Sequence, residues 1–251
     1  MTNSIHFPKA PITEALLDIR VSLPSDTSLE MLELFQQEIK NQYPLTRKRV
    51  SGTFSFGFKD QAAPVVEQSA HTDGFFFTSA DQQRIVQARL DGFTFSWLKP
   101  YDRWETFRDE AKRLWEHYQK IASPLSITRV ALRYINRIDL PFKDGRSVDF
   151  NEYLLTRPEI SPELPQDLAD FFVRLVIMEK KLPAFAVVTQ TLQQADKQSG
   201  VLPLILDIDV FREATFPCAT EEVWCFFEKL RQLKNDVFLR SLTDKTKELF
   251  R

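Results

Sequence analysis

Several residue types that carry common chemistry are scarce in this chain. Only six of its 251 residues are glycine and only three are histidine. A phosphate-binding loop uses glycines where the backbone approaches the phosphate, and no Walker A, dinucleotide-binding or nucleophile-elbow motif occurs. His6, His71 and His117 have no cysteine or carboxylate at ligand spacing. We therefore expect neither a histidine metal site nor a catalytic triad.

Cysteines and long apolar segments are also scarce. Cys218 and Cys225 are the two cysteines, and both fall on one expected helix. Their separation along that helix is about 10 Å, too far for a disulfide bond, so we expect two core residues in a reducing compartment. The N-terminus lacks a basic segment followed by an apolar run, and no stretch approaches the length of a membrane-spanning helix. These absences predict a cytoplasmic protein without a membrane partner.

The charge and size of the chain narrow the expectation further. The formal net charge is −2 and the pI is near 6.0, which gives no general attraction to nucleic acid. Hydrophobic residues make up 43%, with 22 phenylalanines, enough for a substantial core. We expect a single elaborated domain over 1–251, with possible halves at 1–142 and 167–251 on either side of a segment rich in prolines.

Hydrophobic periodicity indicates the elements. Alternating residues predict strands at 14–23, 54–58, 75–78, 84–90, 93–98, 126–140, 171–179, 184–192 and 202–211. A period of 3.6 predicts helices at 28–42, 102–120, 150–155, 220–235 and 241–250. Asp91-Gly92 is a hairpin turn signal, Asp102 and Glu105 form a capping-box pattern, and the polar segment 59–73 is expected to be a loop.

This order of elements predicts an α+β fold. The halves read β-α-β-β-β-β-α-β and β-β-β-α-α. Strands clustered between few helices favour an antiparallel or mixed β-sheet with helices packed mainly on one face. The first half is expected to be an elaborated ferredoxin-like unit.

The strand at 126–140 carries a row of arginines. Arg129, Arg133 and Arg137 are spaced by four, so their side chains share one face. Together with Arg20 they form a candidate anion face that could hold phosphates or carboxylates through bidentate contacts. The simpler interpretation, which we favour, is a solvent face with cross-strand ion pairs. The acidic residues available for such pairs are Glu14, Asp18, Asp207 and Asp209.

Two of these carboxylates offer a second interpretation. Asp207 and Asp209 lie two apart on one strand and so share a face. With Asp139 or Glu14 they could bind a divalent metal for phosphoryl chemistry, if their strands are neighbours. Charged rows on a sheet are similar in general idea to the triphosphate-tunnel enzymes, but the alternating Glu-x-Glu-x-Lys motif of those enzymes is absent. Pairing of these aspartates with arginines is the interpretation we favour.

Three segments carry a family resemblance. They are Phe7 to Arg20, Val130 to Ile138, and Leu230 to Phe250. Together they resemble a sporadically distributed prokaryotic family of about this length that is described only as uncharacterised. The resemblance covers the whole chain and implies no activity. Its patchy distribution is typical of mobile or defence-associated genes.

These observations predict a non-enzymatic binding or protein-interaction component of a bacterial system, of the toxin–antitoxin or phage-defence kind. We expect a protein partner encoded by a neighbouring gene, no cofactor, and no non-specific binding to nucleic acid. The alternative is a metal-dependent enzyme that binds phosphate or nucleotide through the Arg/Asp-lined sheet face. The sequence leaves the oligomeric state open.

Overall fold

A computed structural model describes residues 7–57, 65–142, 148–194, 200–218 and 221–251, with the backbone alone at 53–57 and 65–69. These residues form one nine-stranded sheet in the order β2-β3-β4-β5-β1-β6-β9-β8-β7, and every neighbouring pair is antiparallel. The strands are β1 (Ile12–Ser22), β2 (Leu45–Gly57), β3 (Val65–Thr78), β4 (Arg84–Arg89), β5 (Gly92–Leu98), β6 (Ser126–Pro141), β7 (Phe172–Glu179), β8 (Ala184–Leu192) and β9 (Val201–Phe216).

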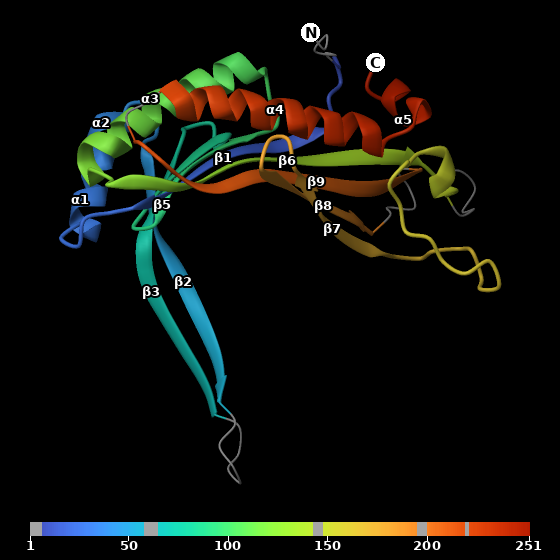
Figure 1. The fold of residues 1–251 in the computed structure, drawn as a ribbon, viewed down its shortest axis with the longest axis horizontal. Coiled ribbons are helices and arrows are strands. Elements are labelled where there is room, and N and C mark those ends of the chain that lie inside the picture. The colour runs from blue at the N-terminus through green and yellow to red at the C-terminus, as the bar shows by residue number, and fades with distance from the viewer. Residues whose placement is uncertain (1–6, 58–64, 143–147, 195–199, 219–220) are drawn as a thin grey trace.

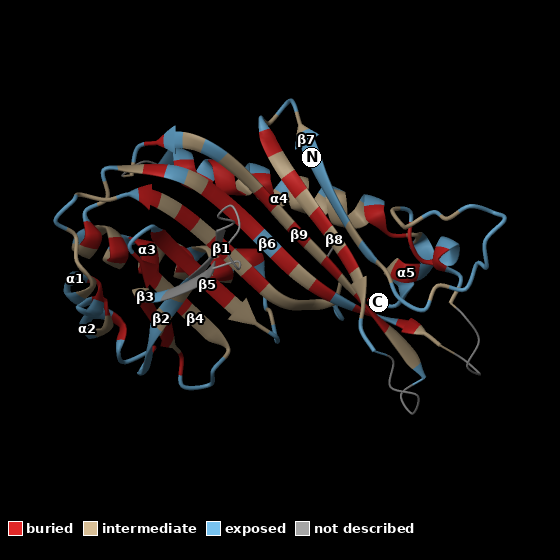
Figure 2. Ribbon diagram, turned by 90° about the horizontal axis from the view of Figure 1, so that it is seen from below, coloured by how far each residue is buried: buried red, intermediate tan, exposed pale blue. Residues whose placement is uncertain are grey.

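Helices cover one face of this sheet. The long helices α3 (Trp104–Ala122) and α4 (Glu221–Ser241) lie across it (Figure 1), and α4 packs on β6, β8 and β9. The short helices are α1 (Leu29–Glu33), α2 (Phe35–Ile39) and α5 (Asp244–Glu248), with a 3-10 turn at Phe150–Glu152. No described helix lies over the opposite face, which Figure 2 shows from below. We call that surface the open face.

Aromatic side chains fill the layer between the helices and the sheet. Phe107 of α3 stacks on Phe95 of β5 with ring centroids 5.2 Å apart. Trp115 and Tyr118 of the same helix pack against Phe93 of β5. Because alternate residues of a strand face opposite sides, this packing places the intervening residues Thr94 and Ser96 on the open face.

The α+β prediction is wrong, because the fold is mostly β. One all-antiparallel sheet runs through the molecule and, within the described ranges, only two α-helices exceed five residues. The predicted ferredoxin-like first half is wrong for the same reason, because its strands belong to this one sheet. The error has a local origin, because the polar segment that was expected to be a loop is largely strand. Residues 65–73 belong to β3 and pair with β2, while 59–64 lie outside the described residues.

Two helix predictions are also wrong in detail. The helix expected at 28–42 is two five-residue helices, α1 and α2, with Leu34 between them. The capping box at Asp102 does not form: Arg103 is the N-cap of α3, and no side chain caps it. Asp102 instead accepts a hydrogen bond from the Thr106 hydroxyl at 3.0 Å.

The β2–β3 hairpin leaves the sheet as an arm. It projects from the side of the open face, well beyond the other strands (Figure 1). In the described part of the chain, no helix combines the length and the apolar character needed to cross a membrane.

Candidate functional site

The strand register gathers the charged residues on the open face. Arg20 of β1 lies opposite Arg129 of β6, and Arg133 of β6 lies opposite Asp209 of β9. Opposing residues in an antiparallel pair point to the same side. The arginine row and the aspartate pair therefore share one face.

Asp18 of β1 is the centre of a network of ion pairs. Its Oδ1 accepts hydrogen bonds from Nη2 of Arg89 at 2.9 Å and from Oγ1 of Thr94 at 2.7 Å. Its Oδ2 accepts hydrogen bonds from Nε of Arg20 at 3.2 Å and from Nη1 of Arg129 at 3.1 Å. One carboxylate thus joins the strands β1, β4, β5 and β6.

The surroundings of Asp18 favour its charged form. Burial alone would raise the pKa of this carboxyl, but the charge of Arg89 and the hydrogen bond from Thr94 lower it below 3.8 on balance. The Arg89 side chain is only 4% exposed and is also paired with Asp91, Nε to Oδ1, at 2.7 Å. A buried guanidinium held between two carboxylates stays charged.

Arg129 and Arg133 of β6 are also paired with the aspartates of β9. Arg129 reaches Asp209 through Nη2 at 3.2 Å, and its guanidinium lies 4.5 Å from the centroid of the Phe211 ring. Arg133 makes a bidentate contact with Asp207, with Nε to Oδ1 at 2.8 Å. Both guanidiniums therefore already hold the kind of ligand that an anion-binding role would require.

Asp209 is the least satisfied member of the network. Burial raises the pKa of its carboxyl above 3.8, and this effect outweighs the charges of Arg129 and Arg133. Its Oδ1 is buried and accepts no hydrogen bond from the described residues. Strained or under-satisfied polar groups of this kind are found at functional sites as well as in structural ion pairs.

Arg137 and Asp139 do not join this network. They pair with each other at 2.9 Å and remain about half exposed. Asp139 lies opposite Pro203 of β9, four residues from Asp207, which corresponds to about 13 Å along the strand. The three aspartates of the metal hypothesis therefore do not converge, and the described residues contain no cluster of three possible metal ligands.

A hollow of about 420 Å³ lies beside the network, where β6, β9, β8 and β7 adjoin. Its lining combines charged groups with apolar ones: Arg129, Arg133, Arg174, Val176, Val187, Asp207, Asp209, Phe211 and Glu213. The sequence pattern did not identify Arg174 or Phe211 as part of this surface. Phe211 alternates with Asp207 and Asp209, and that alternation is the signal that could have placed it there.

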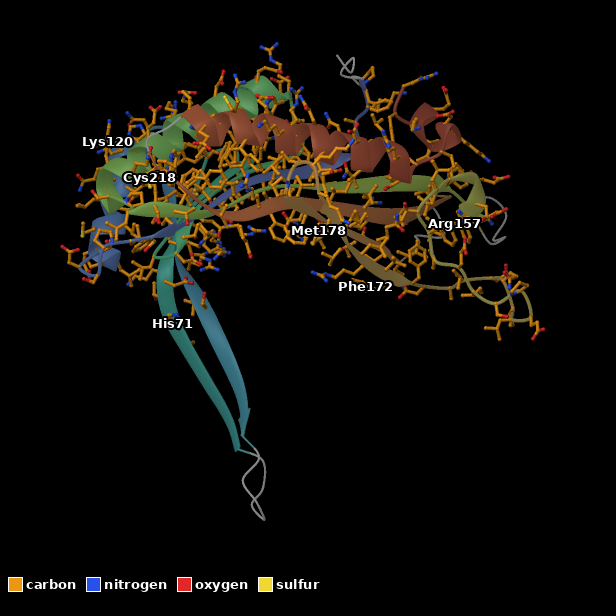
Figure 3. The ribbon with its side chains drawn as sticks, viewed as in Figure 1. His71, Lys120, Arg157, Phe172, Met178 and Cys218 are labelled. Atoms are coloured by element: carbon orange, nitrogen blue, oxygen red, sulfur yellow. The ribbon has the colours of Figure 1, made fainter. Side chains whose placement is uncertain are left out.

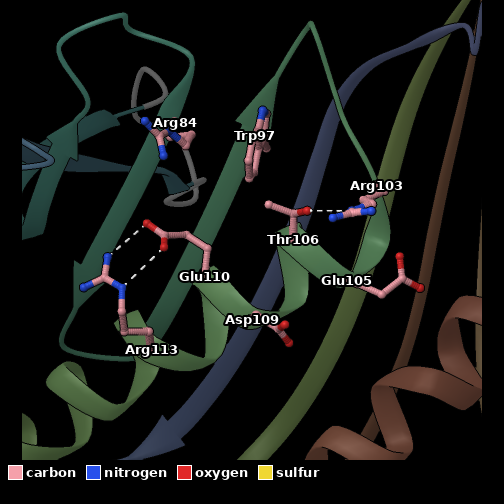
Figure 4. A pocket seen from close by; sticks show the side chains of 8 residues that line it. All are labelled: Arg84, Trp97, Arg103, Glu105, Thr106, Asp109, Glu110 and Arg113. Atoms are coloured by element: carbon pink, nitrogen blue, oxygen red, sulfur yellow. Dashed lines mark hydrogen bonds and ion pairs between the residues drawn. The ribbon is translucent and has the colours of Figure 1, made fainter.

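A second hollow, of about 450 Å³, lies between the start of α3 and the strands β4 and β5 (Figure 4). Its charges also cancel in pairs: Glu110 accepts hydrogen bonds from Arg113 and from Tyr43, the latter at 2.8 Å. Arg84 lies over the Trp97 ring, 5.5 Å from its centroid. None of the candidate residues from the sequence lies here, so the open face remains the candidate site.

No protein-family model matches the chain, and no curated protein matches it. The resemblance to an uncharacterised prokaryotic family therefore stays a prediction.

Proposed function

We propose that this chain is a non-catalytic binding protein, that its partner is another protein, and that the partner binds on the open face beside β6. The observation that carries the proposal is the pairing of Arg129 and Arg133 with Asp209 and Asp207. Charges of both signs lie across this surface around the partly buried ring of Phe211. Such a mixed surface suits the polar and aromatic contacts of a protein interface.

The enzyme alternative has weaker support. Phosphate binding by the arginine row would first break a bidentate Arg133–Asp207 contact and the Arg129–Asp209 contact. Each broken pair would leave a partly buried carboxylate beside the incoming anion, with like charges repelling. For a divalent metal, Asp139 lies too far along the strand from Asp207, and the described residues bring no three possible ligands together, Glu14 included.

Two arginines on the same strand and face give a matched test. Arg133 and Arg137 each expose 45% of the side chain, but only Arg133 lines the hollow. The tagged chain is co-expressed with the products of its neighbouring genes, and the bound protein is quantified by isothermal titration. Arg133→Ala should weaken that complex at least tenfold, whereas Arg137→Ala should leave it within about twofold.

A second experiment, with nucleotides, distinguishes protein binding from the enzyme alternative. Thermal-shift measurements with nucleoside triphosphates, with and without Mg²⁺, should leave the melting temperature unchanged. Nucleotide binding would raise the melting temperature by mass action. A rise that Arg133→Ala removes and Arg137→Ala keeps would contradict the protein-binding proposal and support the enzyme alternative.

A further inference from the structure

The last strand of the sheet, β7, exposes apolar side chains on both of its faces. Phe172, Val176 and Met178 face the open side and are 54–68% exposed. Leu175 and Ile177 face the helix side and are 39% and 46% exposed. Figure 2 shows β7 at the border of the sheet as a largely exposed strand, and Figure 3 labels Phe172 and Met178 on it.

The two edges of the sheet differ in how they are protected. Proteins block free sheet edges with charged side chains, since an unpaired strand is a template for another strand. The opposite edge, β2, carries Arg47, Lys48 and Arg49 in succession. From Phe172 to Met178, β7 carries one charged residue, Arg174, and no described strand pairs with its outer side. Because β7 lacks such protecting charges, another β-strand can pair with its outer side.

We propose that β7 is a homodimer interface, in which the β7 strands of two copies pair antiparallel about a two-fold axis perpendicular to the sheet and centred on Leu175. Such an axis keeps the open faces of both copies on the same side. Because opposing residues of an antiparallel pair point to the same face, the register must then centre on a residue and not between two residues. The two nine-stranded sheets would then continue into one, with the open faces of both copies on the same side. This interface adjoins the partner-binding surface proposed above, because Arg174 and Val176 of β7 also line that hollow. Leu175, on which the register centres, does not line it.

The register centred on Leu175 follows from the sequence of the strand. It places Leu175 opposite its own copy, Phe172 opposite Met178, Val173 opposite Ile177, and Arg174 opposite Val176. Beyond each end of the paired segment it places Asp170 of one copy opposite Lys180 of the other. The two-fold axis therefore gives two Asp170–Lys180 ion pairs, one on each side of the apolar centre. Both residues are exposed in the single chain. The pairs are worth little in stability at a surface, but they select the register.

Neighbouring registers are less complementary. Centring on Arg174 places two guanidiniums opposite each other at the axis. Centring on Ile177 places Arg174 opposite Lys180, again with like charges. Centring on Val176 places Phe172 opposite Lys180, Val173 opposite Glu179 and Arg174 opposite Met178, which is three apolar residues opposite charges, whereas the register on Leu175 has two such pairs, Val176 with Arg174 and Phe171 with Glu179. Like charges directly opposite each other destabilise a strand pair, so the register on Leu175 is the one that the side chains favour.

The first test is the oligomeric state of the full chain by sedimentation velocity between 1 and about 100 µM, a range typical of specific association. The wild type should be dimeric, and Leu175→Lys, which puts two like charges at the axis, should be monomeric. Leu125→Lys is the matched control, because Leu125 is an exposed leucine before β6 and should leave the dimer intact. Circular dichroism verifies that each variant is folded. A monomeric wild type at all concentrations, or a dimer that survives Leu175→Lys, would overturn the proposal.

The second test addresses the register. Asp170→Lys and Lys180→Asp should each weaken the dimer at least fivefold, and the double variant should restore it. In a Cys225→Ser background, Leu175→Cys should form a disulfide-linked dimer under mild oxidation, since opposing residues of an antiparallel pair lie within disulfide distance. Ile177→Cys should not. Equal cross-linking by both cysteines, or a double variant as weak as the single ones, would contradict this register.

Discussion

Asp18 and Asp209 are two carboxylates of one network with opposite energetic roles. Asp18 accepts four hydrogen bonds and its pKa is lowered. Asp209 keeps a buried oxygen without a described partner and its pKa is raised. In each case the sequence shows only an aspartate on a strand. The difference depends on which arginines lie across the neighbouring strands, and a pattern along one strand does not contain that information.

Replacement of each aspartate by asparagine should separate these roles. Asp18→Asn leaves the buried Arg89 short of a carboxylate, which should cost about 3 kcal/mol and lower the melting temperature by about 6–12 °C. Asp209→Asn removes a charge that burial already disfavours, so the melting temperature should change by less than about 3 °C. Thermal unfolding at pH 7 measures both. Equal losses in the two variants would contradict the assigned roles.

The pH dependence of the same pair has a defined sign. The pKa of Asp18 is lower in the folded chain than its ordinary value of 3.8, so its stabilising contribution is complete above that pH. The contribution is lost as the pH falls through the folded-state pKa. The difference in unfolding free energy between the wild type and Asp18→Asn should therefore shrink in acid below about pH 4, as urea titrations at several pH values can show.

Lys234 of α4 gives a second prediction. Its Nζ lies 3.8 Å from the centroid of the Tyr134 ring. Burial, together with the charge of Arg231, lowers the pKa of this lysine from 10.5 to about 7. The unfolded chain then binds more protons than the folded chain between those values, so stability should rise with pH across that interval.

Lys234→Met should raise the unfolding free energy at pH 7, because it removes a charge from a partly buried position while keeping a long apolar side chain. The gain should decline as the pH approaches 10, where the lysine is neutral in the folded state. Lys229→Met is the control, since Lys229 is exposed on the same helix. Denaturant unfolding at three pH values is the measurement, and a gain that does not depend on pH would contradict the account.

At the scale of elements, strands with one clear apolar face were predicted well. The strand predicted at 184–192 is β8 with the same bounds, and the strand predicted at 126–140 is β6, which ends one residue later. The hairpin predicted from Asp91-Gly92 forms, but its turn is one residue earlier: Arg89 pairs with Gly92, so Leu90 and Asp91 are the loop residues. β3 was only partly found. Its first part pairs only with β2 in the projecting arm, so no core selects an alternating pattern there.

Gly92 ties this turn to the neighbouring strand. Its φ of +153° is rarely adopted by residues with a side chain, and an added Cβ would lie 2.2 Å from the backbone oxygen of Ile19. Gly92→Ala should therefore force β5 away from β1, at a cost of about 2 kcal/mol. Thermal unfolding should show a melting temperature about 4–8 °C lower. An unchanged value would mean that the two strands separate there without penalty.

At the scale of the molecule, the mostly-β class and the order of the strands were beyond the sequence pattern. Nine strands can be ordered in many ways, and pairing such as β1 with β5 and β6 joins segments that are far apart in the chain. The same pairing determines the candidate site. The sequence predicted that the arginines share a face and named Asp18, Asp207 and Asp209 among their possible partners, and the structure shows these ion pairs. Which arginine pairs with which aspartate follows from the strand order, which the sequence pattern does not contain.

We propose that the open face beside β6 binds a protein and not a phosphate ligand. The most direct measurement is the affinity of Arg133→Ala and Arg137→Ala for the partner captured by co-expression. The affinity should fall at least tenfold for Arg133→Ala and hardly at all for Arg137→Ala. Equal affinities for both variants, or a nucleotide-induced thermal shift that depends on Arg133, would contradict it.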